Sequence, residues 1–87
     1  MIELQYALIP DAVQALTVFL GEPFAVQNGR NIGLGAVSKA KWMGPGWIVW
    51  TDHFRTADHG TTVRCFLSFE DARNETVFRL KHTDLIK

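Results

Sequence analysis

The residues of this 87-residue chain that could do chemistry include two adjacent pairs, Asp52-His53 and Asp58-His59. Carboxylates and imidazoles bind zinc and other divalent metals, and a histidine oriented by a carboxylate can act as a general base. Neighbouring residues of a strand point to opposite faces, so Asp52 and His53 do not converge easily. We therefore expect a polar network and predict no cofactor. A small enzyme or metal-binding protein that uses these four residues stays an alternative.

No nucleophile stands in an identifiable catalytic setting. Arg64 and Glu70 complete the acid–base candidates, and neither lies in a recognisable motif. Cys65 is the only cysteine, which excludes an intramolecular disulfide framework. It lies among strand residues, so we expect a buried and unreactive thiol. The sequence thus leans against an enzyme.

A second group of residues mixes aromatic and basic side chains. Trp42 stands beside Lys39 and Lys41, an arrangement that could stack nucleic-acid bases and hold phosphates. Nine basic and nine acidic residues give no formal net charge, however, and phosphate binding needs a positive surface. A nucleic-acid-binding module is therefore the less favoured alternative. The residues that we predict to contact a ligand are Trp42, Trp47, Trp50, His53 and Arg64.

The composition indicates a globular protein with many aromatic residues. Hydrophobic residues make up 47% of the chain, with three Trp, six Phe and one Tyr. The length predicts one domain, residues 1–87. The first residues lack the basic and apolar regions of a signal peptide, and no apolar run reaches membrane-spanning length. We expect a cytoplasmic protein with no membrane partner.

The stretch 46–54 predicts a central strand. Its β-branched and aromatic residues are typical of strands. Alternation puts Trp47 and Val49 on one face and Ile48 and Trp50 on the other. A strand that is apolar on both faces usually has something packed against each face. The stretch 61–69 predicts a second strong strand.

The other elements follow from periodicity and turn residues. Residues 2–8 alternate and predict a first strand that Pro10 ends. A helix is expected from Asp11, with Gln14 completing a capping box, to a stop at Gly21. Four further segments are a strand at 24–27, a return strand at 31–38 after an Asn28-Gly29 turn, a turn at 44–46 and a last strand at 76–81. The residues expected to be buried are Leu16, Phe19, Trp47 or Trp50, Leu67 and Phe78.

These elements predict an α+β fold, with one short N-terminal helix packed on a strongly twisted antiparallel sheet of about five strands. Residues 33 to 87 resemble the layout of a small SH3-like barrel, with a Gly44-Pro45-Gly46 turn, three strands linked by hairpins and an Asp84-Leu85-Ile86 ending. The resemblance implies that the sheet could curl into a partly closed barrel. It implies no function, because this fold hosts unrelated functions.

The leading functional hypothesis is a small non-enzymatic binding protein that self-associates through an aromatic-rich sheet. One helix can cover one face of the sheet, and the other face must be closed by barrel curvature or by a second subunit. Homodimers are the commonest solution for such a surface. The sequence therefore predicts a homodimer, and a protein or a small aromatic molecule is a further possible partner.

Overall fold

A computed structural model describes residues 1–27, 40–55 and 61–87, and the side chains of all of these except 53–55 and 61. The strands are β1 (Ile2–Leu4), β2 (Ala25–Gln27), β3 (Lys41–Gly44), β4 (Trp47–Arg55) and β5 (Thr61–Phe69). The helices are α1 (Ile9–Phe19) and α2 (Ala72–Lys81), accompanied by the short 3-10 helices η1 (Tyr6–Leu8) and η2 (Thr83–Leu85). The predicted α+β class is confirmed.

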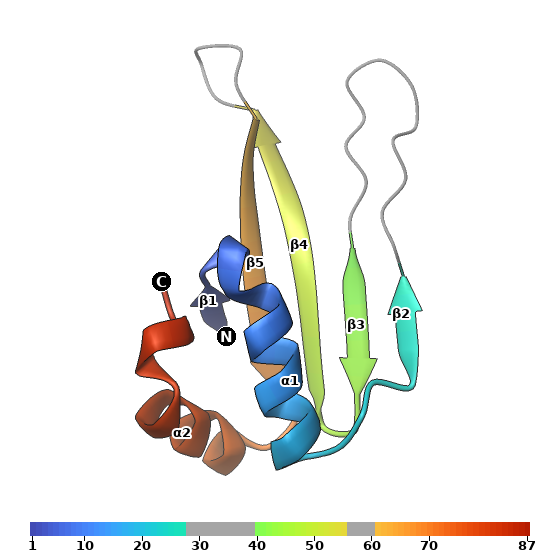
Figure 1. Cartoon of the computed structure of the whole chain (residues 1–87), viewed down its shortest axis with the longest axis vertical. Helices are drawn as coiled ribbons and strands as arrows, with labels where there is room; N and C mark the ends of the chain where they lie inside the picture. Colours follow the sequence, from blue (N-terminus) through green and yellow to red (C-terminus); the bar gives the residue numbers. More distant parts are fainter. Residues whose placement is uncertain (28–39, 56–60) are drawn as a thin grey trace.

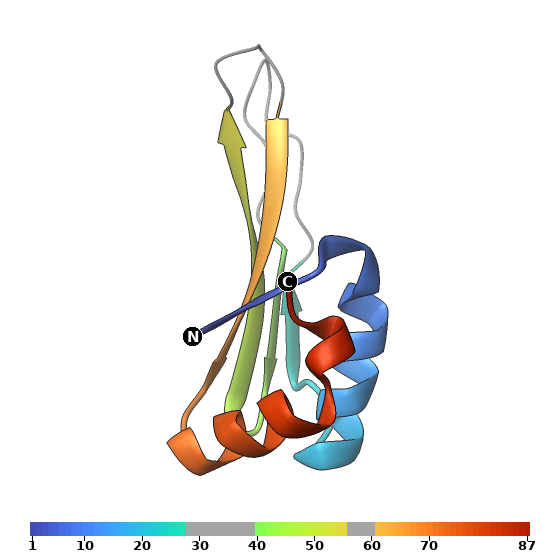
Figure 2. The ribbon, with the colours of Figure 1, turned by 90° about the vertical axis from the view of Figure 1, so that its left-hand side faces the viewer.

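The five strands form one antiparallel sheet in the order β1-β5-β4-β3-β2 (Figure 1). The two longest strands, β4 and β5, are paired over their whole length, from Trp47 opposite Phe69 to Arg55 opposite Thr61. Both helices lie on the same side of the sheet (Figure 2). The sheet is open, with β1 and β2 at opposite edges, so the barrel closure implied by the SH3-like layout is wrong.

The hydrophobic core lies between the helices and the sheet. Val49 of β4 and Leu67 of β5 are register partners and are fully buried, as are Leu16 of α1 and Phe78 of α2. The ring of Phe69 contacts Phe78 at a centroid distance of 5.5 Å, so β5 and α2 are joined through aromatic packing. Leu16, Trp47, Leu67 and Phe78 are buried as predicted, while Phe19 and Trp50 are only partly buried.

The turn between β3 and β4 is confirmed and depends on two glycines. Pro45 supplies a fixed φ, and Gly46 follows with a φ of +77°, which a residue with a side chain rarely adopts. A Cβ at Gly44 would collide with the indole ring of Trp47. The indole Nε1 of Trp47 donates to the carbonyl of Gly21 at 3.2 Å, so this buried tryptophan is anchored as well as packed.

The start of the chain differs from the predicted strand 2–8. Leu4 is buried, but the chain leaves the sheet at Gln5 and forms η1, where Tyr6 is exposed. Helix α1 then begins at Ile9 and not at Asp11, with Pro10 in its first turn, where the missing N–H costs nothing. The predicted capping box is therefore wrong. No helix in the described parts of the chain has the length and apolar character needed to cross a membrane.

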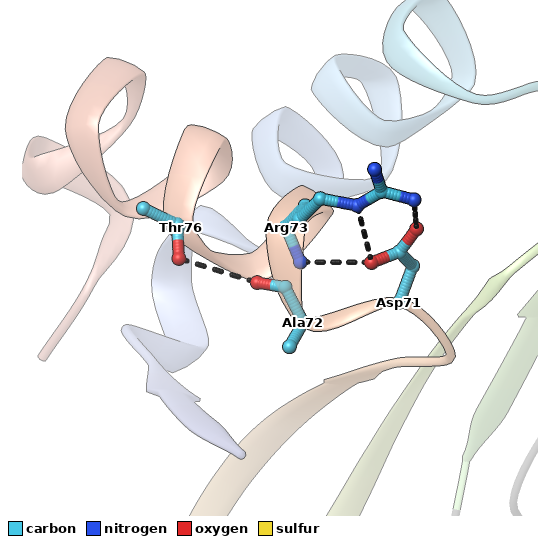
Figure 3. A network of polar contacts seen from close by, with 4 residues as sticks. All are labelled: Asp71, Ala72, Arg73 and Thr76. Atoms are coloured by element: carbon cyan, nitrogen blue, oxygen red, sulfur yellow. Dashed lines mark hydrogen bonds and ion pairs between the residues drawn. The ribbon is translucent and has the colours of Figure 1, made fainter.

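The predicted last strand, 76–81, is instead part of helix α2. Asp71 caps this helix by accepting a hydrogen bond from the backbone N–H of Arg73 at 2.9 Å, and the Arg73 guanidinium folds back onto the same carboxylate (Figure 3). The Thr76 hydroxyl donates to the carbonyl of Ala72 at 3.2 Å. The alternating pattern was misleading because only Phe78 of its apolar residues is buried, while Leu80 is 78% exposed.

The predicted strand at 24–27 is confirmed as β2, while the Asn28-Gly29 turn and the return strand 31–38 lie outside the described residues. The strand that pairs with β2 is β3, in a segment for which the sequence predicted no strand. Ala40, the residue before β3, provides hydrogen-bond partners for the buried Thr51 of β4. The Thr51 N–H donates to the Ala40 carbonyl at 2.9 Å, and its hydroxyl accepts from the Ala40 N–H at 3.0 Å.

Truncating Leu67 should strongly destabilise the protein, because its side chain is 0% exposed at the centre of the core. We expect Leu67→Ala to lower the free energy of unfolding by about 2–5 kcal/mol, the range for large-to-small core substitutions. Leu80→Ala is the matched control and should cost no more than about 0.5 kcal/mol. Urea denaturation of both variants measures the difference, and equal losses would contradict the packing described.

Cys65 should resist thiol reagents in the folded protein. Its side chain is fully buried, and this burial raises the pKa of the thiol to about 12, so little thiolate exists near neutral pH. We expect modification by a chromogenic thiol reagent only after denaturant is added. Rapid labelling of the native chain would show that β5 opens locally, contrary to this prediction.

Candidate functional site

The candidate site is the side of the sheet that faces away from the helices, which we call the outer face. Side chains of register partners lie on the same face, so the pairing defines this surface row by row. The central row runs across the sheet through Glu3, Phe66, Trp50, Lys41 and Gln27. One neighbouring row holds Ser68, Ile48, Met43 and Ala25, and the other holds Arg64 and Asp52. None of the described elements covers this face (Figure 2).

An aromatic pair forms the middle of the outer face. The rings of Trp50 on β4 and Phe66 on β5 lie 5.7 Å apart between centroids, with an interplanar angle of 32°. Aromatic pairs at such distances contribute beyond the area they bury. Both side chains are partly buried by their neighbours in the sheet, and each leaves part of its surface open to solvent. The pair is thus a preformed apolar platform.

An ion-pair network borders the platform on the β1 side. The Arg64 guanidinium binds the Glu3 carboxylate through two contacts, 2.6 Å from Nη2 to Oε1 and 3.1 Å from Nε to Oε2. The same guanidinium lies over the Phe66 ring, 5.2 Å from its centroid. The Lys87 ammonium is 3.4 Å from Glu3 Oε2. Arg64 is therefore fixed by a carboxylate on one side and an aromatic face on the other.

This network shifts the pKa of Glu3. The hydrogen bonds from Arg64 are the largest cause, and they lower the pKa of the carboxyl from its ordinary value of 4.5 to about 2, with Lys87 adding to the effect against partial desolvation. The reciprocal hydrogen bond raises the pKa of Arg64. Glu3 stays ionised over the physiological pH range, so the network persists there.

A hollow of about 280 Å³ lies beside the aromatic pair, on the β3 side. Gln27, Ala40, Lys41, Trp50 and Asp52 line it. Its walls combine one indole, one ammonium, one carboxylate and one amide, so the outer face changes here from apolar to polar. Together with the Glu3 network, this hollow gives the platform a charged border on both sides.

The structure brings together two of the five residues predicted to contact a ligand. Trp50 and Arg64 both lie on the outer face, linked through Phe66. Trp47 is 3% exposed and belongs to the core on the opposite face. Trp42 pairs with Val49, so it also faces the helix side, where it packs partly buried against the core. Trp42 and Trp47 are therefore not part of this site.

The catalytic and metal alternatives rest largely on side chains that are not described. Asp52 lies on the outer face, while the side chain of His53 and all of Asp58 and His59 lie outside the described residues. Within the described parts of the chain, no group of three or more His, Cys, Asp or Glu side chains is placed to hold a metal ion. Lys39 also lies outside, and Lys41 and Trp42 point to opposite faces. The predicted Trp42–lysine cluster is therefore not formed by these two residues.

Sequence reasoning missed the contact between Glu3 and Arg64 and the groove between the two helices. The groove has a volume of about 670 Å³, and its lining includes Asp11, Val18, Phe19, Val77, Lys81 and Asp84. It could not be foreseen while residues 76–81 were predicted to form a strand. The capping residue Asp71 was the available signal for a helix there.

Comparison of the chain with protein-family models, curated proteins and solved structures found no match. The function is therefore inferred from the geometry of the outer face.

The Glu3 network should make stability depend on pH in the acidic range. Because the pKa of Glu3 is lower in the folded protein, its contribution is fully present above about pH 4.5 and is lost as the pH falls toward about 2. We expect Glu3→Gln to be less stable than the wild type near neutral pH. The free energies of unfolding of the two proteins should converge as the pH falls from about 4.5 to about 2. Urea denaturation at several pH values tests this, with Glu70→Gln as an exposed control. A difference in the free energy of unfolding between wild type and Glu3→Gln that does not change with pH would contradict the lowered pKa of Glu3.

Proposed function

We propose that this protein is a small non-enzymatic interaction protein that forms a homodimer through the outer face of its sheet. The observation that carries the proposal is the one-sided cover of the sheet. Both helices pack on one face, and the opposite face presents Ile48, Trp50, Phe66 and Met43 without a described covering element.

The composition of the outer face supports an interface. Contiguous exposed apolar patches on soluble proteins commonly mark interaction sites. Trp, Phe and Met are enriched at interfaces, and a large aromatic side chain near the middle of the patch is the usual energetic centre. The Trp50–Phe66 pair has this position, with Trp50 on the central strand β4 and Phe66 on its neighbour β5. The charged residues lie around it, as in the polar rim of an interface.

Binding of single-stranded nucleic acid is the second candidate, because Trp50 and Phe66 could stack bases. The charges on the outer face favour self-association. Among the described residues, Lys41, Arg64 and Lys87 share this face with Glu3 and Asp52, and the Glu3 carboxylate binds both Arg64 and Lys87. Phosphate binding would need a larger excess of cations than these described residues supply.

We propose the cytoplasm as the location, because a single free and buried thiol, that of Cys65, is compatible with a reducing compartment.

The wild-type protein should sediment at twice its chain mass of 9.8 kDa at micromolar concentration. Replacing Trp50 by Glu puts a charge at the centre of the interface and should raise the dimer dissociation constant by ~10-fold or more. Leu80→Glu adds the same charge on the exposed side of α2 and should leave the constant unchanged.

Sedimentation equilibrium measures both constants, and circular dichroism checks that the variants are folded. A wild type that remains a monomer at every accessible concentration would refute the proposed function. A dimer weakened by Leu80→Glu and not by Trp50→Glu would place the interface elsewhere.

A further inference from the structure

The charges on the outer face are arranged with opposite signs on the two sides of one line. This line, which we call the midline, runs parallel to the strands between β4 and β5. On one side lie β5, β1 and the C-terminal segment, where Ile86 bridges Leu4 and the N–H of Lys87 donates to the Glu3 carbonyl at 2.9 Å. On the other side lie β4, β3 and β2. The midline thus has two strands and the C-terminal segment on one side and three strands on the other.

Two pairs of opposite charge lie at equal distances from the midline. Arg64 on β5 and Asp52 on β4 are register partners directly beside it. In the next row, Glu3 on β1 and Lys41 on β3 each lie one strand farther out. Phe66 and Trp50 occupy the same row between them. For these four charged residues, a reflection of positions across the midline therefore exchanges acid with base, and it exchanges one aromatic ring with the other. Lys87 lies outside this pattern, beside Glu3 at the β1 edge.

A twofold axis parallel to the midline makes this exchange between two molecules. When two copies stack with their outer faces together, such an axis puts β5 over the partner's β4 and β1 over the partner's β3. Lys41 then lies opposite the partner's Glu3, Arg64 opposite the partner's Asp52, and Phe66 opposite the partner's Trp50. Stacked sheets lie about 10 Å apart, so long charged side chains from both copies can meet between them.

Three other twofold axes bring like charges together. An axis along β4 puts Asp52 opposite the partner's Asp52, and an axis along β5 puts Arg64 opposite the partner's Arg64. An axis across the strands at the central row puts Glu3 opposite the partner's Glu3, and likewise for Lys41. Like charges across an interface disfavour the wrong arrangement, and opposite charges fix the register.

We infer that the outer face binds a second copy of this chain in a face-to-face dimer whose twofold axis runs parallel to β4 and β5, midway between them. This inference rests on the proposed self-association and adds its geometry. The aromatic pair supplies the apolar centre of the interface, and the two charge pairs select this one orientation.

A charge exchange between two variants tests the inferred contact. Lys41→Glu and Glu3→Lys each create two like-charge contacts in their own homodimers, so each should dimerise ~10-fold or more weakly than the wild type. An equal mixture should restore tight dimers, because the heterodimer has opposite charges at both contacts. Because lysine and glutamate residues have nearly equal masses, one variant is labelled uniformly with ¹⁵N, and native mass spectrometry then distinguishes the heterodimer from both homodimers. Lys81→Glu, an equal change of charge on α2, is the control and should form no preferential heterodimer with Glu3→Lys.

A distance measurement in the otherwise wild-type chain keeps the test independent of Glu3, whose replacement also removes its contacts with Arg64 and Lys87. Spin labels are placed at Glu70→Cys in one sample and at Thr62→Cys in another, while the buried Cys65 stays unlabelled. These sites lie four residues to either side of Phe66 along the chain. The inferred axis puts like sites at the same end of the dimer, with backbones ~10–15 Å apart, whereas an axis across the strands separates them by ~30 Å.

Short distances for both labels together with preferential heterodimers are the expected result. A dimer with long label distances, or with no preference in the charge exchange while both variants are folded, would overturn the inferred axis and leave self-association standing. A wild type that stays monomeric would overturn the proposed function and this inference together.

Discussion

The alternation of apolar side chains along β4 and β5 is the constraint on which the rest of the structure depends. These paired strands present Val49 and Leu67 to one side of the sheet and Trp50 and Phe66 to the other. The described parts of the chain form two α-helices, and both cover the first side. Burial of that side produces the core, and the lack of a described cover on the second side produces the candidate site. Fold and proposed function thus follow from one pattern.

The ends of the chain determine the shape of the outer face. Glu3 enters the central row because β1 pairs with β5, and the C-terminal segment then pairs with β1. Lys87 therefore reaches Glu3 across nearly the full length of the sequence. The Glu3 carboxylate in turn fixes the Arg64 guanidinium over the Phe66 ring. Long-range strand pairing thus organises both the aromatic surface and its charges before any partner binds.

The sequence predicts most reliably those elements whose local signals agree with their packing. The strands around Val49 and Leu67 combine β propensity with alternation, and the Gly44-Pro45-Gly46 turn is formed as expected. The segment that forms helix α2 was wrongly predicted to be a strand. The spacing of Thr76, Phe78 and Leu80 matches strand alternation, whereas the structure buries only Phe78. Here the cap at Asp71 and the contact between Phe78 and Phe69 prevail over periodicity.

The candidate site could be predicted only in part. Alternation alone places Trp50 and Trp47 on opposite faces of the strand, but it does not say which face the helices cover. The pairing of Glu3 with Arg64 spans 61 positions of the sequence and depends on the order of strands in the sheet, which no local pattern encodes. For this reason Arg64 was identified as a candidate while its partner was not.

The most direct test of the outer face as a self-association surface is the concentration dependence of the three tryptophan indole N–H signals in NMR spectra. The chain has one tryptophan in the core, Trp47, one on the helix side, Trp42, and one in the proposed interface, Trp50. Dilution from the dimer to the monomer should shift the Trp50 signal and leave that of Trp47 in place. Dilution that dissociates the dimer and leaves the Trp50 signal unchanged would contradict the account.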